Sequence, residues 1–468
     1  VYAGSAMGAT FAGDLITLFI FWELLAVSSV FLIWARRTAS STRAGIRYLV
    51  YQVLSGVLLL AGALVYHHYT DSLAFDFIGL ENPGGWLILL AFGIKCAFPF
   101  LHTWLTDAYP ASTHTGAAVL SVFTTKVAIY ALARGFPGTD ILIYIGAVMT
   151  CFPIFYAVLE NDLRKVLSYS LINQLGFMVC AIGIGTALSL NGAVAHAFSH
   201  ILYKSLLFMS MGAVMYRVGH TYASDLGGLY KSMPKTTVLC IIGAASISAV
   251  PLFSGFVAKS LVMTELLQQG RIVVWLMLLF ASAGVLHHAG IKVPFFAFYA
   301  HDSGIRTQEA PVNMLVAMFI TAVLCVAIGV LPQHLYSILP WEMDYWPYDI
   351  THVLAQLQLL FFAALAFVWM EIKHYAPPEL HSTNVDAEWF YRKLFPSAFR
   401  NIVKTIATAK SYVTATTVTA AQRIRASFLQ TEVAKYHLAE SWPAGSMVFW
   451  ISAILAAYLL LGLFGLGR

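Results

Sequence analysis

The sequence predicts an all-α polytopic membrane protein, and three observations support this fold class. Of its 468 residues, 59% are hydrophobic and only 10% are charged, whereas soluble domains average about 25% charged residues. Apolar runs of about 18 residues or more recur along the whole chain, and each can cross a hydrocarbon core of about 30 Å as a helix. Lysines and arginines collect in alternate loops, as expected if the runs are membrane spans.

About twelve spans are predicted, preceded by a partial one at 1–12. The runs lie at 15–35, 44–69, 86–105, 114–134, 140–159, 164–186, 190–216, 236–267, 272–299, 311–331, 351–371 and 444–466. The eighth contains Pro251 and Gly255, and the third contains Pro99, so we expect both to be broken helices. Since 1–12 makes only half a span, we expect that earlier helices are missing from this sequence.

The two broken spans are five apart in the order, which suggests a five-helix repeat. A repeat with an odd number of spans must run inverted in its second copy, as in many secondary transporters. We therefore expect a shortened first inverted repeat at 1–135 and a second at 136–300, with additional spans at 301–375. A basic segment with apolar residues at helical spacing predicts an amphipathic lateral helix at 376–440, on the membrane surface. A closing transmembrane helix follows at 441–468.

The loop charges predict the orientation. Arg36, Arg164 and the basic residues of 392–435 fall on one side, whereas acids such as Asp71 and Asp140 fall on the other. By the positive-inside rule the basic side is cytoplasmic. We expect a bacterial-type inner membrane protein with its basic loops and lateral helix in the cytoplasm.

Away from the ends of the predicted spans, the basic residues are all lysines. They are Lys95, Lys126, Lys204, Lys259 and Lys292. A charged lysine at the centre of a span costs roughly 2.5–3.5 kcal/mol, so these side chains must pair, reach water or lose their charge. Lysine can release its proton when buried, whereas arginine stays charged. The choice of lysine therefore indicates groups that change protonation state.

Glu23 and Lys95 lie at similar depths in their spans, so an ion pair between them can form. Lys126 lies at a similar depth one span later. Lys95 would then have an acidic and a basic neighbour, and withdrawal of the acid would release its proton.

His196, His200 and Lys204 follow one another at spacings of four, which places them on one helix face. Histidine both accepts and donates protons near neutral pH, so this stripe is interpreted as a relay. Zinc binding is the competing interpretation, but no third ligand is evident.

Lys259 follows Pro251 and Gly255 and completes the predicted proton-transfer residues. Further candidates are His102, Lys292 and His287. Each has a simpler interpretation: His102 as an interface anchor beside Trp104, Lys292 as a side chain that snorkels to the interface, and His287 as a packed or water-facing residue.

The sequence offers no motif for a cofactor. The cysteines form no CxxC pair, and neither a GxGxxG stretch nor a phosphate-binding loop is present, so we expect no cofactor, no bound metal and no nucleic-acid partner.

Several stretches resemble the proton-translocating antiporter-like family. They are GDLITLFIFWELLAVSSVFLI, GIKCAFPFLHTWLTDAYP, LRKVLSYSLINQLGFM, HAFSHILYKSLLFMSMG and GFVAKSLVMTELL. The family includes Mrp-type Na+/H+ antiporter subunits and the membrane-arm subunits of complex I and membrane-bound hydrogenases. The resemblance covers about 1–330 and is greatest to the D-type subunits of Mrp antiporters.

This resemblance implies two inverted repeats joined by a hydrophilic axis. By position it makes Glu23 the essential glutamate, Lys95 its lysine partner and Lys126 the bridging lysine. It assigns the central connection to the His196, His200 and Lys204 stripe, and the exit half-channel to Lys259. The shortened start and the lateral helix depart from a minimal antiporter subunit.

The sequence thus predicts a proton-translocating subunit of a multi-subunit Na+/H+ antiporter, with no catalytic site of its own. Its partners would be other membrane subunits, the lipid bilayer, H+ and also Na+ if this chain carries it. One alternative is a proton-pumping subunit of a complex I-like or hydrogenase redox complex. Another is a structural subunit that does not conduct.

Overall fold

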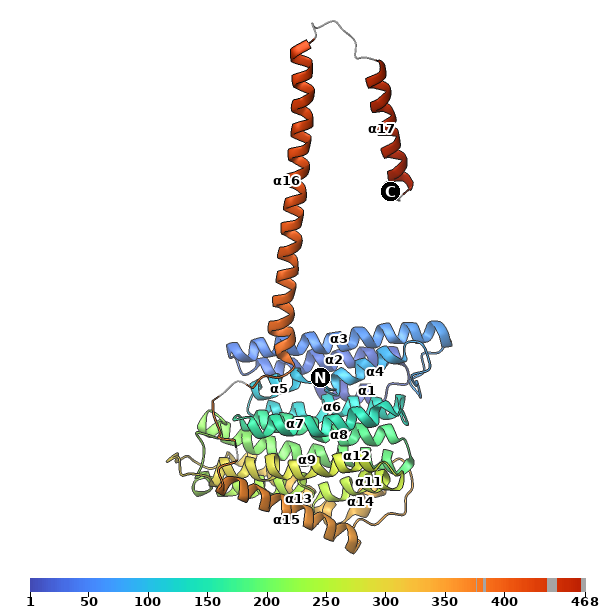
Figure 1. Ribbon diagram of the computed structural model, residues 1–468. Helices are drawn as coiled ribbons and strands as arrows, with labels where there is room; N and C mark the ends of the chain where they lie inside the picture. Colours follow the sequence, from blue (N-terminus) through green and yellow to red (C-terminus); the bar gives the residue numbers. More distant parts are fainter. Residues whose placement is uncertain (376, 382–383, 436–443, 464–468) are drawn as a thin grey trace. The chain divides into compact units, whose positions relative to one another are not determined.

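The computed structural model describes residues 1–375, 377–381, 384–435 and 444–463 (Figure 1). Throughout these residues the regular elements are helices, together with two isolated β-bridges. The chain divides into two compact units, 1–388 and 389–468, and each is described by itself.

The first unit contains most of the helices. They are α1 (Tyr2–Thr10), α2 (Leu15–Trp34), α3 (Ala39–Thr70), α4 (Gly85–Lys95), α5 (Thr103–Ala111), α6 (Gly116–Gly135), α7 (Ile141–Leu159), α8 (Leu163–Ile184), α9 (Ala187–Val218), η1 (Leu229–Lys231), α10 (Pro234–Ile247), α11 (Ser254–Gln268), α12 (Ile272–Val285), η2 (Leu286–Lys292), η3 (Phe295–Tyr299), α13 (Val312–Val330), α14 (Pro332–Tyr336) and α15 (Ile350–Ile372). In Figure 1 the long helices of this unit run roughly parallel, from α3 at one edge to α15 at the other.

Within the described residues, nine helices are long and apolar enough to cross a membrane. They are α2, α3, α6, α7, α8, α9, the continuous stretch Ile272–Tyr299, α13 and α15. The other three predicted runs contain the shorter apolar helices α4, α10 and α17. The expected all-helical, multi-pass membrane protein is confirmed.

Helix α8 is the most enclosed of the nine, because 94% of its apolar window is buried. It packs closely on α7 at two facing glycines. A Cβ on Gly176 would lie 2.6 Å from the carbonyl oxygen of Gly146, so only glycine permits this backbone approach. The polar residues of α8 therefore face the interior.

The third and eighth runs are broken, as their prolines predict. The first break separates α4 from α5 around Pro99, and the second separates α10 from α11 around Pro251. Both linkers hold the same two positions in the left-handed region: Ala97 (φ 63°) and Phe100 (φ 67°) in the first, Ala249 (φ 57°) and Leu252 (φ 75°) in the second. Non-glycine residues adopt this conformation rarely, so the two linkers share an unusual backbone path.

A second correspondence lies in the pair of helices before each break, α2 with α3 and α8 with α9. Asp14 precedes α2 and pairs with Ala74 in an antiparallel bridge after α3. Asp162 precedes α8 and pairs with Tyr222 after α9 in the same way. In both cases the aspartate side chain also accepts a hydrogen bond from the first turn of its helix, as an N-cap does.

The second unit contains η4 (Phe390–Leu394), α16 (Phe395–Lys435) and α17 (Ala444–Leu463). Helix α16 has 41 residues, about 60 Å at 1.5 Å per residue. Of the segments expected at 376–440 and 441–468, residues 376, 382–383, 436–443 and 464–468 lie outside the described residues. Residues 377–381 and 384–388 belong to the first unit.

Candidate functional site

Glu23 and Lys95 lie in adjacent helices but do not form an ion pair within 4.0 Å in the described structure. Lys95 is the last residue of α4 and is fully buried. Its Nζ donates a hydrogen bond to the carbonyl oxygen of Trp22 at 2.5 Å and lies 4.4 Å from the centre of the Trp22 ring. The Glu23 carboxylate interacts electrostatically with Lys95, while its Oε1 is buried without a hydrogen-bond partner in the described residues.

A glycine makes room for this carboxylate. Gly56 on α3 is buried against Glu23, and a Cβ at Gly56 would overlap Glu23 Oε1. The position of the carboxylate therefore depends on the absence of a side chain at residue 56.

Lys126 lies on α6 and is 9% exposed. Its Nζ donates to the carbonyl oxygen of Ser121 at 2.7 Å and to the hydroxyl of Thr125 at 3.2 Å. Its charge acts on His200 and Lys204 of α9. Its charge also acts on Cys96, which follows Lys95 at the first break, so Lys126 lies between that break and the stripe on α9.

The stripe on α9 is buried along its whole length, because His196, His200 and Lys204 are each 0% exposed. His196 Nε2 lies 3.1 Å from Gln174 Oε1 and 2.9 Å from the hydroxyl of Tyr203. The same hydroxyl donates to Gln174 Oε1 at 3.1 Å. This closed triangle fixes the orientation of the His196 ring.

His200 lies between the other two members of the stripe. Its ring centre is 6.4 Å from that of His196 and 5.3 Å from that of Tyr203. Neither ring nitrogen has a hydrogen-bond partner in the described part of the chain. A buried imidazole with both nitrogens free of protein partners can accept a proton on one side and donate on the other.

Lys204 and Lys259 also donate to neutral oxygens. Lys204 Nζ lies 2.9 Å from the hydroxyl of Ser170. Lys259 is 4% exposed, and its Nζ lies 2.9 Å from the carbonyl oxygen of Ile247. Ile247 is the last residue of α10, so the second break supplies this acceptor.

These lysines share one property. Lys95, Lys126, Lys204 and Lys259 are buried, bonded to uncharged oxygens, and without an ion pair in the described structure. A carbonyl or hydroxyl oxygen accepts a hydrogen bond from an amine as well as from an ammonium group. The arrangement therefore allows each lysine to lose its proton without leaving a buried counter-charge.

Lys292 differs, because an acid neutralises it. It lies at the end of η2, and its Nζ is 2.8 Å from Glu379 Oε1, with the two side chains 2% and 10% exposed. It also donates to the carbonyl oxygens of Val158 at 2.6 Å and Glu160 at 2.8 Å. Lys292 does not reach the surface, so the snorkelling interpretation is wrong. Burial raises the pKa of Glu379, and the charge of Lys292 lowers it in part.

His102 is also buried and paired. It is 2% exposed, and its Nε2 lies 3.1 Å from Asp386 Oδ2. The hydroxyl of Tyr169 donates to the same oxygen at 2.7 Å. Burial by itself would raise the pKa of Asp386, but the hydrogen bond and charge of His102, with the bond from Tyr169, hold it below its usual value. The interface-anchor interpretation of His102 is wrong.

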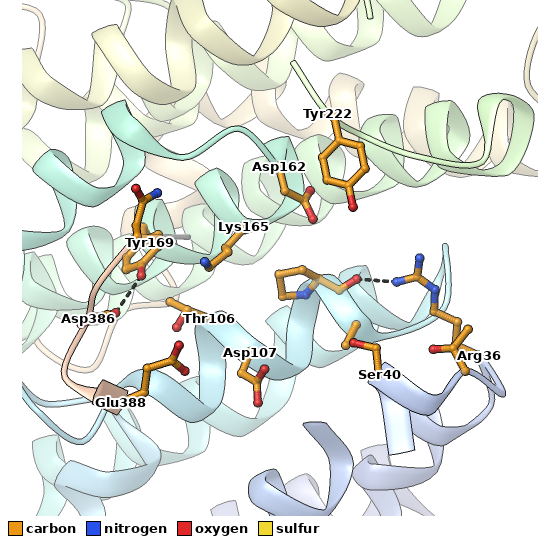
Figure 2. A pocket seen from close by; sticks show the side chains of 14 residues that line it. Arg36, Ser40, Thr106, Asp107, Asp162, Lys165, Tyr169, Tyr222, Asp386 and Glu388 are labelled. Atoms are coloured by element: carbon orange, nitrogen blue, oxygen red, sulfur yellow. Dashed lines mark hydrogen bonds between the residues drawn. The ribbon is translucent and has the colours of Figure 1, made fainter. Parts of the chain in front are cut away.

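A polar cavity of about 400 Å³ lies beside this pair (Figure 2). Its charged lining residues are Arg36, Asp107, Asp162, Lys165, Asp386 and Glu388. Burial raises the pKa of Asp162, against a hydrogen bond from Thr221. Figure 2 shows Asp386 and Tyr169 at one end of the lining and Arg36 at the other.

The sequence reasoning missed several polar residues of this interior. Glu379 and Asp386 lie in the segment after α15, far along the chain from the residues they contact. Gln174 and Tyr203 lie inside predicted spans, where an amide and a hydroxyl need partners. The polar stretch SLINQ within an apolar run was the available signal. In the stretch Ile272–Tyr299, His288 is fully buried and His287 is half-buried, and only His287 was among the candidates.

Comparison with known proteins places this chain in a family. The model of the NADH:quinone oxidoreductase/Mrp antiporter transmembrane family matches residues 12–286. Hydrogenase-4 component B of Escherichia coli K12 is 28% identical over 352 residues, covering 66% of this chain and 52% of that protein. The D-type subunit of the Na+/H+ antiporter of Alkalihalophilus pseudofirmus OF4 is 30% identical over 323 residues, covering 64% of this chain and 65% of that protein.

The fold has known counterparts as well. A chain of the Mrp complex from Dietzia sp. DQ12-45-1b superposes with a TM-score of 0.66 at 21% identity, covering 81% of this chain and 78% of that one. The chain spans 52% and 65% of the lengths of these two curated relatives. With more than half of its residues matched by the family model, the chain belongs to the NADH:quinone oxidoreductase/Mrp antiporter transmembrane family.

Proposed function

We propose that this chain is the proton-translocating subunit of a multi-subunit Na+/H+ antiporter. The observation that carries the proposal is the row of buried lysines that donate to uncharged oxygens. In order, the proton-transfer residues are Glu23, Lys95, Lys126, Lys204, His200, His196 and Lys259. The antiporter assignment is supported by the similarity to the D-type subunit of an Na+/H+ antiporter.

The proton moves by changes in which group holds it. A lysine that loses its proton keeps its hydrogen bond to the same oxygen, so the surrounding structure needs little rearrangement. His200 has free nitrogens between Lys204 and His196, and it carries the proton between Lys126 and Lys259, whose charges act on it. Neighbouring positive charges repel, so protonation of one lysine favours release from the next.

Glu23 controls the first step. When its carboxylate approaches Lys95, the ion pair holds the proton on the lysine. In the arrangement described here the Lys95 ammonium is bonded to Trp22 instead. Withdrawal of Glu23 leaves Lys95 ready to pass its proton towards Lys126.

We further propose that 1–135 and 136–300 are two inverted repeats, each forming a half-channel, with additional spans at 301–375. Two correspondences support this: the matching left-handed positions around Pro99 and Pro251, and the bridges of Asp14 and Asp162. The interval of five spans between the breaks requires the second copy to be inverted.

The basic loops would face the cytoplasm of a bacterial-type inner membrane. Helix α16, which is 41 residues long and mostly exposed over residues 395–427, would lie along the cytoplasmic membrane surface, and α17 would cross the membrane. Other membrane subunits would complete the complex.

A second candidate is a proton-pumping subunit of a redox complex, because one relative is a hydrogenase component. The same lysines would work there, driven by electron transfer in other subunits. A structural subunit that does not conduct is the third candidate, and the retained lysines argue against it.

The test is to purify the complex in mild detergent through a tag on this chain and to identify its members by mass spectrometry. Small membrane proteins without cofactor motifs, together with Na+-driven H+ exchange in vesicles, would support the antiporter. Companions with cysteine-ligated clusters, flavin or nickel sites would replace it with the redox pump. If Lys95→Ala left proton transport unchanged, the structural subunit that does not conduct would be the remaining candidate.

A further inference from the structure

Two adjacent histidines lie outside the proposed path and have no role in it. His288 is 0% exposed, and both of its ring nitrogens lack a hydrogen-bond partner in the described residues. The two ring nitrogens of His287 are buried without a partner in the same way. Leaving buried polar atoms unpaired is costly, so an explanation by packing alone is weak.

Both histidines lie on η2, a π-helical stretch. Such stretches are rare and are often found at functional sites. Gly290 in η2 packs against the end of α10, where a Cβ would collide with Ser248 Oγ. Ser248 follows Ile247, the hydrogen-bond acceptor of Lys259, so η2 lies against the second break.

The histidines connect two charged groups. The charges of Lys204 and Lys292 both act on His288, as does neighbouring His287. The charge of Lys292 also acts on His287. Together they lie between the central stripe on α9 and the buried ion pair at the end of η2.

The far end of this row opens into a cavity. Glu379 pairs with Lys292 through Oε1, while its Oε2 is buried without a hydrogen-bond partner in the described residues. The same residue lines a cavity of about 480 Å³, together with Ser224, His301, Glu371 and His374. These loops belong to the basic side of the chain.

We propose that Glu379, Lys292, His287 and His288 form a proton inlet from this cavity to Lys204. The inlet rests on the proposed function, which it extends by naming where protons join the central stripe. Each transfer breaks one O–H or N–H bond and forms one O–H or N–H bond on the next group. The carboxylate takes a proton from a hydronium ion in the cavity, leaving water, and Lys292 passes its own to a neutral imidazole. The relay ends on the Lys204 amine, and Glu379 returns the proton to Lys292.

A purely structural interpretation is that the Lys292–Glu379 pair fastens the segment after α15. The two interpretations differ for Lys292→Arg. Arginine keeps the charge and the ion pair but cannot release its proton. A fastening role tolerates arginine, whereas a relay does not.

The experiment uses the tagged complex in inside-out membrane vesicles and measures H+ flux with a pH-sensitive dye. The variants are Lys292→Arg, Glu379→Gln and His288→Gln. We expect each to lower the flux at least about 10²-fold, the lower end of what a proton-transfer group contributes. Matched controls are Asp302→Asn, which removes an exposed ion pair with Lys231, and the exposed His68→Gln. Both should keep wild-type flux.

Wild-type flux in Lys292→Arg or Glu379→Gln would overturn the inlet, whatever His288→Gln does. Because His288 is fully buried, its variant can fail to assemble, and the other two then decide. Glu23→Gln in the same assay separates the proposals. If Glu23→Gln stops the flux and the inlet variants do not, only the inlet is wrong. If Glu23→Gln also keeps the flux, the proposed function is wrong.

Discussion

The ammonium group of Lys95 lies 2.5 Å from the carbonyl oxygen of Trp22, the residue immediately before Glu23. The lysine is therefore held by the backbone of the glutamate's own helix rather than by its carboxylate. In the proposed mechanism, a movement of the Glu23 side chain exchanges one acceptor for the other. This is the relationship on which the proposed switching of Lys95 depends.

Gly56→Ala should reduce proton transport by displacing Glu23. The added methyl group would overlap the carboxylate oxygen, and the glutamate must then adopt another rotamer. We expect at least about a tenfold loss of flux, since Glu23 would no longer reach its position beside Lys95. The measurement is dye-reported H+ flux in inside-out vesicles.

Gly4→Ala is the matched control, because a Cβ at Gly4 meets nothing within 4 Å. It should transport like wild type. If Gly56→Ala also does so at equal expression, the placement of Glu23 is not important for transport.

Tyr203→Phe should slow transport without unfolding the protein. The hydroxyl bonds both His196 and Gln174, and its loss frees the imidazole to rotate. Losing one such hydrogen bond corresponds to about 1–1.5 kcal/mol, or about tenfold in rate. Tyr216→Phe, on the exposed surface of the same helix, should change neither flux nor thermal stability. Equal flux in the two variants would contradict a role for the triangle.

The contact of residues 384–388 with His102 and Tyr169, which is made by Asp386, should depend on pH. The pKa of Asp386 is lower in the folded protein than in the unfolded chain, so its contribution is present above the unfolded value of about 3.9 and is lost as the pH falls through the folded pKa. The hydrogen-exchange protection factors of residues 384–388 should therefore stay constant from pH 7 to about 5 and fall in stronger acid. Asp386→Asn should lower these protection factors already at pH 7, because it removes about 1–3 kcal/mol of local stability.

Asp225→Asn provides the comparison. It removes an exposed ion pair with His381, which has the same 3.1 Å distance as the pair of Asp386 with His102. Exposed pairs contribute about 0–1 kcal/mol, so exchange should hardly change. A larger effect for Asp225→Asn than for Asp386→Asn would contradict the argument from burial.

The backbone of the second break should favour glycine at Leu252. This residue has φ 75° and is 56% exposed, so truncation removes little burial and relieves strain of about 1–2 kcal/mol. We expect Leu252→Gly to match or exceed the thermal stability of wild type, and Leu252→Val to fall by about 1 kcal/mol or more. Leu64→Val, in a helix and also 56% exposed, should have a smaller effect. A stable Leu252→Val would contradict the strain.

Most of the fold could be predicted because its signals are local. Runs of apolar residues set the spans, and Pro99 and Pro251 break the third and eighth. The burial of Lys95 and Lys126 followed from their places in apolar runs, since a membrane offers them no other surroundings. The helical spacing of His196 and His200 likewise placed them on one face.

Contacts between distant parts of the chain could not be predicted in this way. His102 and Asp386 are 284 residues apart, and neither helical periodicity nor composition relates them. The same holds for Lys292 and Glu379. The sequence did show that a lysine buried in a span needs a hydrogen-bond acceptor. It did not show which residue provides that acceptor, because this depends on the positions of loops, and these leave no pattern in the sequence.

The most direct test of the central claim compares Lys95→Arg with Lys95→Ala and wild type in one vesicle assay of H+ flux. If Lys95 works by changing its protonation state, both variants should lose transport by about 10²-fold. Alanine has no group to protonate, and arginine keeps its charge and does not release its proton. The exposed Lys231→Arg should transport normally. Wild-type flux in Lys95→Arg, with expression and assembly equal, would contradict the claim that this lysine passes the proton.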